Sequence, residues 1–245
     1  MPEPPKFSVI MPLHREHERL PDVRSRIHSA GSSVELIMVL NDAKLAGKVR
    51  AEQSNEQTII YERSGRGFAF ARGVAEAKGD ITVLLHGDTM LPVGWDGAIL
   101  AALSDARVVG GGFHMAFDRS SRYLDFLVRL SDFLVFMRFA MWGDRAMFAR
   151  TAVLRECAGA LAVPLFEDVR LSKALRRRGR LNLLDNTVIT SADHFWKNGP
   201  FTQSMRILKA RAWYALGGDP QKIYDYYYSR QIRPDRDKDG KGLSE

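Results

Sequence analysis

Four short and almost uninterrupted apolar runs within residues 1–90 constrain the fold of this chain more than any other feature. They cover residues 7–11, 34–40, 57–61 and 81–85, and segments with helical spacing lie between several of them. A strand with one wet face alternates apolar and polar residues, whereas a strand buried on both faces is apolar throughout. The pattern therefore predicts an α/β fold, with a mostly parallel central sheet and helices on both faces.

The rest of the chain continues the same domain. We expect helices at 94–103, 123–140, 167–178 and 201–216, a strand at 107–116, and edge strands at 181–184 and 188–190. No repeat and no Gly/Ser linker divides the chain, and 245 residues suit one large α/β domain. We predict a single domain over 1–232. Residues 233–245 carry almost no apolar side chains and are predicted to be a disordered tail.

Charge and composition indicate which partners and which cellular environment the protein is suited to. Lys and Arg number 36 against 29 Asp and Glu, a net charge of +7, which suits an anionic partner as well as an ordinary soluble protein. The six basic residues within 170–180 are expected to form a solvated helix face. No apolar run is long enough to span a membrane, and Met1–Lys6 does not resemble a signal peptide. The single cysteine, Cys157, excludes an internal disulfide and agrees with a cytoplasmic location.

Polar side chains follow three of the predicted strands. They are His14 and Glu16 after the first strand, following Pro12, then Asn41 and Asp42 after the second, and His86 and Asp88, on either side of Gly87, after the fourth. Taken singly, each is more typical of a turn or a helix cap than of a binding site. Because ligands bind beyond the carboxyl ends of the strands in an open parallel sheet, three such ends together predict a binding site.

Asp88 is the sharpest candidate in that set. A carboxylate at a strand end can bind Mg²⁺ or Mn²⁺, which in turn holds a diphosphate, and His86 two residues earlier would favour Mn²⁺. His194 is a candidate third ligand or phosphate donor. The competing interpretations are a turn cap for Asp88 and an ordinary loop histidine for His194.

Two further motifs carry candidate chemistry. Ser64-Gly65-Arg66-Gly67 opens a predicted helix, where backbone N–H groups and Arg66 can hold a phosphate. As a dinucleotide fingerprint it is weak, because Phe70 stands at the third glycine position and the turn follows the third strand. Glu167 and Asp168 begin another predicted helix. One interpretation is that these acids interact favourably with the positive end of the helix dipole. The other is that one of them is a general base for an acceptor hydroxyl.

These motifs, in this order, resemble family 2 glycosyltransferases with the GT-A fold. FSVIMPLHRE resembles the first strand and nucleotide-facing loop, VELIMVLNDA the base-contacting segment, GRGFAFARGVAEAKGDITVLLHGDT the stretch leading into the DxD metal motif, and FEDVRLSKALRRRGR the acidic motif with the catalytic base. The subgroup most similar is the rSAM/selenodomain-associated transferase 2 type, whose His-Ala-Asp-Thr is matched by His86-Gly87-Asp88-Thr89. The chain departs from the family at Asn41 and His86, where aspartates are usual, and at Asp193-His194, where the subgroup is more often basic.

The resemblance implies an inverting transferase that moves a sugar from a UDP- or GDP-linked donor to an acceptor hydroxyl, with Mn²⁺ or Mg²⁺. It implies a nucleotide-binding half over about 7–105 and an acceptor half over about 106–232. The implied site residues are Pro12, His14, Glu16, Asn41, Asp42, Arg66 and Gly87 for the nucleotide, Asp88, His86 and His194 for the metal, Asp168 and Glu167 for catalysis, and His114, Trp142 and Asp144 on the acceptor side.

Two other classes remain as alternatives. A nicotinamide-dependent oxidoreductase would need a glycine-rich turn after the first strand, where the chain has Pro12-Leu13-His14. A non-catalytic protein that binds nucleic acid or a membrane surface would use the basic excess but leaves the strand-end carboxylates unexplained, and we expect no nucleic-acid partner.

The predicted apolar helices 123–140 and 201–216 are relevant to whether the acceptor is lipid-linked. Met205, Leu208 and Ala212 share a face when placed at about 100° per residue. We expect both helices to pack on the sheet. The alternative is peripheral docking on an anionic bilayer, which would bring the enzyme to a lipid-linked acceptor.

Overall fold

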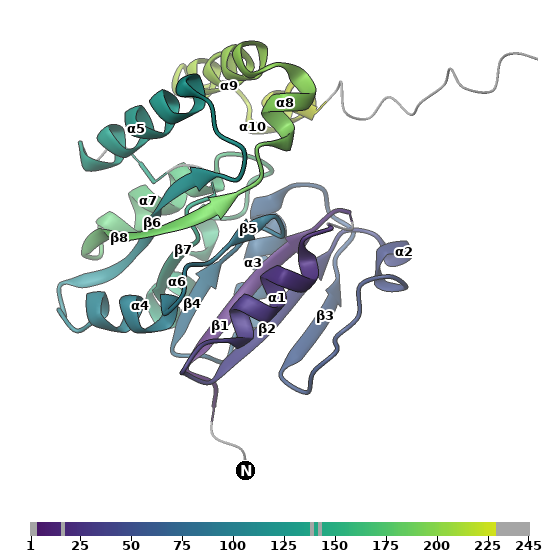
Figure 1. The fold of residues 1–245 in the computed structure, drawn as a ribbon, viewed down its shortest axis with the longest axis vertical. Coiled ribbons are helices and arrows are strands. Elements are labelled where there is room, and N and C mark those ends of the chain that lie inside the picture. Colours follow the sequence, from purple (N-terminus) through teal and green to yellow (C-terminus); the bar gives the residue numbers. More distant parts are fainter. Residues whose placement is uncertain (1–3, 16–17, 138–139, 142–143, 229–245) are drawn as a thin grey trace, which may run out of the picture.

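The computed structural model describes residues 4–15, 18–137, 140–141 and 144–228. Within these residues one sheet of eight strands has the order β3-β2-β1-β4-β7-β6-β8-β5 (Figure 1). The strands are β1 (Phe7–Leu13), β2 (Val34–Leu40), β3 (Glu56–Ile60), β4 (Ile81–Leu84), β5 (Thr89–Met90), β6 (Val108–Phe117), β7 (Met147–Arg150) and β8 (Arg180–Thr190). Pairing is parallel except where β7 meets β4 and β6, and where β5 meets β8. The predicted mostly parallel sheet is therefore confirmed.

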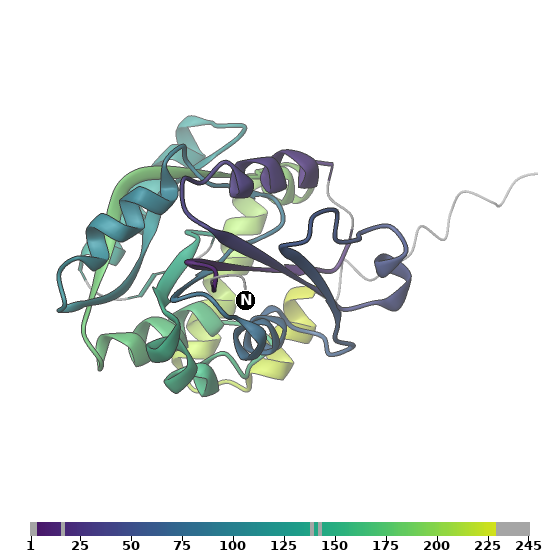
Figure 2. The ribbon, with the colours of Figure 1, turned by 90° about the horizontal axis from the view of Figure 1, so that it is seen from below.

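Helices cover both faces of this sheet. They are α1 (Leu20–His28), α2 (Ala43–Ala46), α3 (Arg66–Glu76), α4 (Trp95–Leu103), α5 (Arg122–Phe136), α6 (Thr151–Glu156), α7 (Glu167–Arg176), α8 (Asp193–Asn198), α9 (Pro200–Ala215) and α10 (Pro220–Tyr228), with a 3₁₀ turn at Ala158–Ala160. One core joins α1 and α4 to one face, and a second core joins α3, α6 and α7 to the other. Figure 2 shows α1 and α3 on opposite sides of the sheet.

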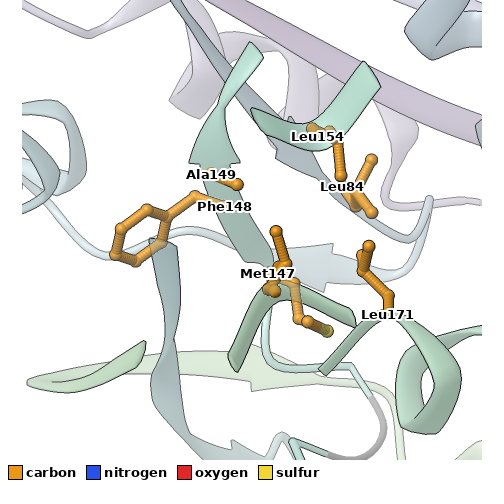
Figure 3. A pocket seen from close by; sticks show the side chains of 7 residues that line it. Leu84, Met147, Phe148, Ala149, Leu154 and Leu171 are labelled. Carbon is orange, nitrogen blue, oxygen red and sulfur yellow. The ribbon is translucent and has the colours of Figure 1, made fainter. Parts of the chain in front are cut away.

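Successive side chains of the buried strands point to opposite faces of the sheet and so contribute to different cores. Phe7 of β1 faces α4, where its ring meets Trp95 edge-on at 5.0 Å between centroids, whereas Ile10 belongs to the core beneath α3. In β7, Met147 and Ala149 point toward Leu84, and Phe148 points to the other face (Figure 3). Leucines of α6 and α7 close this side so tightly that the space between them does not admit a water molecule. Both faces of the strands are thus dry, as continuous apolar runs require.

The structure corrects the predicted end of the first strand. Pro12 does not stop β1, which continues to Leu13 in register with β2. The carbonyl of Ile10 accepts from Leu85 on the β4 side, and that of Leu13 accepts from Asn41 on the β2 side. Pro12 lies two residues from Ile10 and so faces the β4 side, where β4 has already ended. The missing N–H of proline therefore costs no ladder bond.

One prediction in the second half of the chain is also wrong. The segments expected as two edge strands form one strand, β8, which lies inside the sheet between β6 and β5. Its register shifts opposite Phe113 and His114, and this irregularity divides the apolar pattern into two short runs. The helix predicted at 201–216 is present as α9, and the shorter helix α10, which was not predicted, follows it. No helix in the described ranges is long and apolar enough to cross a membrane. The predicted tail at 233–245 lies outside the described residues.

Candidate functional site

A cluster of charged side chains lies beyond the carboxyl ends of β1 and β4, at the start of α3 and α7. At its centre Arg66, the first residue of α3, places its Nε 3.1 Å from Oε1 of Glu167, the first residue of α7. The Nη1 of Arg66 lies 3.8 Å from Oδ1 of Asp144. The sequence thus singled out Arg66 and Glu167 separately, and the fold brings them together with a residue predicted for the acceptor side.

Close packing around two glycines creates this contact. A Cβ at Gly67 would lie 2.2 Å from the carbonyl oxygen of Val163, and Gly65, at φ +117°, packs against Pro164. Phe166, which precedes α7, has the left-handed φ of 64° that non-glycine residues rarely adopt. The glycines of the Ser64–Gly67 turn are therefore required by the approach of the 161–167 segment, which aims Glu167 at Arg66.

The Glu167 carboxyl is a buried acid without a full set of partners. Its side chain is 3% exposed, and no hydrogen-bond donor among the described residues reaches Oε2. Burial raises its pKa to about 7, and the charges of Asp168 and Asp144 add to the rise while Arg66 opposes it. A buried carboxyl poised near neutral pH, beside other carboxyls, is typical of functional sites.

Asp144 joins His86 to the same cluster. His86 Nε2 lies 3.1 Å from Asp144 Oδ1, and Thr190 donates to Asp144 Oδ2 over 3.2 Å. Burial lowers the pKa of His86 to about 4, with Arg66 lowering it further and Asp144 opposing, and the ring packs edge-on against Phe70. The imidazole is therefore neutral at pH 7 and keeps a nitrogen lone pair, which is the form that ligates metals.

Asp88 lies in the turn after β4, next to the buried Gly87. Burial raises its pKa to about 6, the charge of Asp144 raises it further, and Arg15 opposes. Within the described residues, no three His, Cys, Asp or Glu side chains are grouped closely enough to hold a metal ion by themselves. A cation here would need donors from its ligand in addition to Asp88 and its neighbours.

His194, on α8, lies at the border of the cluster. Its ring stacks on Tyr227 at 6.2 Å between centroids. Burial lowers its pKa, Arg15 and Arg206 lower it further, and Asp144 opposes. The structure thus places His194 within the field of Asp144 but not in a three-ligand metal group with His86 and Asp88.

Asp168 lies on the less buried side of the acidic pair. It is half-buried, and its Oδ1 accepts the backbone N–H of Val169 over 2.7 Å. Its charge acts on Arg66, Glu167 and Arg211, so it belongs to the same electrostatic cluster. Of the two acids at the start of α7, Asp168 is the one that a molecule entering from solvent can reach.

The tyrosines of α10 are site residues that sequence reasoning missed. Tyr228 is close enough to Arg66 to raise the pKa of the guanidinium, and burial raises the pKa of Tyr228 to about 12. Tyr227 accepts from Gln203 Nε2 over 3.0 Å and contacts His194. The run Tyr226-Tyr227-Tyr228 was the available signal, but only the position of α10 connects it with Arg66.

The remaining candidates are more scattered. His14 is exposed at the end of β1, and its charge reaches His86. Asn41 and Asp42 are exposed at the end of β2, and Asp42 caps α2 by accepting from the backbone N of Lys44 over 2.8 Å. The capping interpretation of Asp42 is therefore confirmed, while Pro12 is half-buried in β1.

The other acceptor-side candidates do not gather around Asp144. His114 Nδ1 lies 2.8 Å from Asp132 Oδ2 on α5. The other oxygen of Asp132 binds Arg145, whose fully buried guanidinium also donates to the carbonyl of Phe113. This network fastens α5 to β6. Glu16 and Trp142 lie outside the described residues.

Comparison with known proteins supports the fold. The sequence matches no family profile, and no curated protein is similar enough to count as a relative. The mannosyltransferase PcManGT from Pyrobaculum calidifontis, solved with GDP-Man and Mn²⁺, superposes with a TM-score of 0.60 at 17% identity, over 96% of this chain and 66% of that one. TarS from S. aureus (residues 1–349) gives 0.57 at 15% identity, over 94% and 73%. Its complex with UDP-GlcNAc gives 0.51 at 16%, over 76% and 56%. The predicted GT-A fold is confirmed.

Proposed function

We propose that this protein is a glycosyltransferase that uses a nucleotide-diphospho-sugar donor. The observation that carries the proposal is a cluster at the strand ends, where ligands bind in such sheets: Asp144, Glu167 and Asp168 surround Arg66, and Asp88 lies within the field of Asp144. The fold neighbours include a mannosyltransferase solved with GDP-Man and Mn²⁺, and TarS solved with UDP-GlcNAc. A GDP- or UDP-linked sugar is accordingly the donor class we propose.

The donor side is assigned to the ends of β1, β2 and β4. The candidate nucleotide contacts are Pro12, His14, Glu16, Asn41, Asp42, Arg66 and Gly87. The site fits a divalent cation held jointly with the diphosphate, because Asp88 and Asp144 repel each other and His86 is neutral. Asp88 would hold Mn²⁺ or Mg²⁺, with His86 and His194 as candidate neighbours. Such an ion supplies Lewis-acid stabilisation of the charge on the departing diphosphate.

On the acceptor side, Asp168 is the proposed general base. It takes the proton of the acceptor hydroxyl as the hydroxyl oxygen bonds to the anomeric carbon and the bond from that carbon to the diphosphate oxygen breaks. Attack from the face opposite the leaving group inverts the anomeric configuration. Glu167, buried against Arg66, is a positioning residue that fixes the start of α7. A lipid-linked molecule is one acceptor class that we propose.

The test is nucleotide binding by the protein and by Asp88→Ala. GDP or UDP with Mn²⁺ should raise the melting temperature of the wild type, because a ligand that binds only the folded state stabilises it. Asp88→Ala should lose the Mn²⁺-dependent part of that rise, whereas Asp22→Ala, which removes an exposed carboxylate from the first turn of α1, should keep it. A folded Asp88→Ala variant with unchanged Mn²⁺-dependent binding would contradict the metal assignment. Stabilisation by NAD in place of GDP or UDP would favour the oxidoreductase.

A further inference from the structure

Helix α9 presents an apolar stripe outward. Phe201, Met205, Leu208, Ala212 and Leu216 recur at intervals of three or four residues and therefore lie on one face. All of them are exposed, Phe201 by 68%, Leu208 by 58% and Leu216 by 88%. The opposite side of the helix carries the buried Gln203 and Ala210. We expected the helix at 201–216 to pack its apolar side chains on the sheet. The exposed side chains of the stripe show that this expectation is wrong for them.

Helix α5 behaves in the same way at the same end of the molecule (Figure 1). It buries Leu124 and Val135 and exposes Phe126, Leu130, Phe133 and Phe136. An ordinary protein surface exposes apolar side chains singly, whereas α5 and α9 each expose a row of aromatic and aliphatic side chains. We call the exposed side chains of α5 and α9 named here the apolar face.

Basic side chains border the apolar face. Residues 200–216 include Arg206, Lys209 and Arg211 and no acid. Arg206 and Lys209 are held over the ring of Tyr226, at 5.9 and 5.2 Å from its centroid. On α5, Arg122, Arg129 and the acidic Asp125 line a surface hollow of about 230 Å³ beside Phe126. Cations outnumber acids among these bordering residues, so an apolar partner that carries negative charge fits this face.

We propose that the apolar face docks on an anionic lipid bilayer. A helix with an apolar stripe, flanking cations and nearby Trp and Tyr side chains lies in the plane of a membrane surface. Anionic headgroups would neutralise Arg206 and Lys209. A second copy centred on α9 fits less well, because a two-fold axis there would bring the acid-free α9 against itself. Residues 229–245 have only Ile232 and Leu243 as large apolar side chains, too few to cover the stripe.

Vesicle sedimentation of the full chain tests the proposal. The protein should sediment with phosphatidylglycerol vesicles at low salt, more weakly at high salt, and not with pure phosphatidylcholine. Leu208→Glu should reduce the binding constant by about ten-fold or more, because it removes an apolar side chain that the bilayer would bury and adds repulsion from the anionic headgroups. Val93→Glu is the matched control, since Val93 is 77% exposed just before α4, and it should bind like the wild type.

Three results would overturn docking. They are no sedimentation at low salt, an equal loss in Val93→Glu, and a wild-type dimer in light scattering that Leu208→Glu dissociates, which would assign the face to a second copy. Melting curves would check that both variants fold. Vesicle binding is measured without any nucleotide, so its failure leaves the transferase proposal untouched, and failure of nucleotide binding leaves docking untouched.

Discussion

Two buried glutamates in this molecule each lie beside an arginine, but the pKa of Glu56 is lowered and the pKa of Glu167 is raised. Glu56, at the start of β3, accepts hydrogen bonds from Nε and Nη2 of Arg24. Its carboxylate also accepts from the backbone N–H of Glu52 over 2.7 Å and lies 2.7 Å from Nε2 of His28. Burial acts to raise its pKa, but these hydrogen bonds outweigh burial and lower it. Glu167 has one arginine at 3.1 Å, an oxygen without a partner among the described residues, and a pKa raised to about 7.

The contrast separates a structural ion pair from a site. Each oxygen of Glu56 is satisfied, and its partners tie α1 to β3, so the charge is fixed whatever binds elsewhere. Glu167 shares Arg66 with Asp144 and lies beside Asp168, so one cation is surrounded by several carboxylates. A buried cluster with excess negative charge is completed only by a ligand, a cation or a proton. This incompleteness is the ground on which we assign the Arg66 cluster to the proposed site and the Glu56 pair to the scaffold.

The largest expected effect comes from Asp168→Asn. The amide keeps the shape of the side chain but cannot accept a proton, so donor turnover should fall by about 10²–10⁴-fold, while stabilisation by donor and Mn²⁺ persists. Release of nucleotide diphosphate from the identified donor measures turnover. Asp22→Asn is the control, because Asp22 also lies in the first turn of a helix, and it should be silent. Normal turnover by Asp168→Asn would move the base elsewhere, with Glu167 as the first candidate.

Glu56→Gln should damage the fold and spare the chemistry. It leaves the guanidinium of Arg24, 7% exposed, without its compensating charge, which costs about 3–5 kcal/mol of unfolding free energy. Urea denaturation measures the loss, and nucleotide affinity of the folded fraction should not change. The exposed partner Glu52 provides the comparison, since Glu52→Gln removes a charge from the same arginine at a cost of about 0–1 kcal/mol. Equal losses in both variants would contradict the structural assignment of Glu56.

Glu167 should make the fold less stable as pH rises. A carboxyl whose pKa is higher in the folded state than in the unfolded state binds more protons when folded, so its contribution is present below pH 4.5 and is lost as pH rises through about 7. Relative to Glu167→Gln, the wild type should lose up to about 3 kcal/mol across that window. Parallel urea titrations from pH 4.5 to about 8 give this difference directly. A constant difference would mean that Arg66 keeps Glu167 ionised throughout.

The same comparison shows which features sequence reasoning could reach. Continuous apolar runs identify β1, β2 and β4, because burial on both faces leaves a local pattern. The pairing of Arg66 with Glu167 joins residues about a hundred positions apart, and nothing local in either motif encodes it. The two parts of β8 looked separate because a register shift interrupts them, and α10 was missed although its tyrosines lie beside Arg66. Local periodicity predicted the scaffold and the residue types of the site, and long-range packing decided their partners.

The smallest expected effect, and the most direct test of how the two glutamates come to differ, is that of Gly67→Ala. Its Cβ would lie 2.2 Å from the carbonyl oxygen of Val163 and 2.3 Å from that of Leu161, and backbone atoms cannot rotate away as a side chain does. The start of α3 must therefore move from the 161–167 segment, at a cost of about 1–3 kcal/mol. Gly97→Ala is the matched control, because Gly97 lies in α4 and a methyl group there would have no described atom within 4 Å, so alanine should stabilise the helix by about 0.5–1 kcal/mol. If Gly67 serves to hold Arg66 against Glu167, its variant should also shift the pH at which Glu167 loses its proton, whereas Gly97→Ala should not. A Gly67→Ala protein with wild-type stability and an unchanged pH profile would show that the Ser64–Gly67 turn does not set the contact.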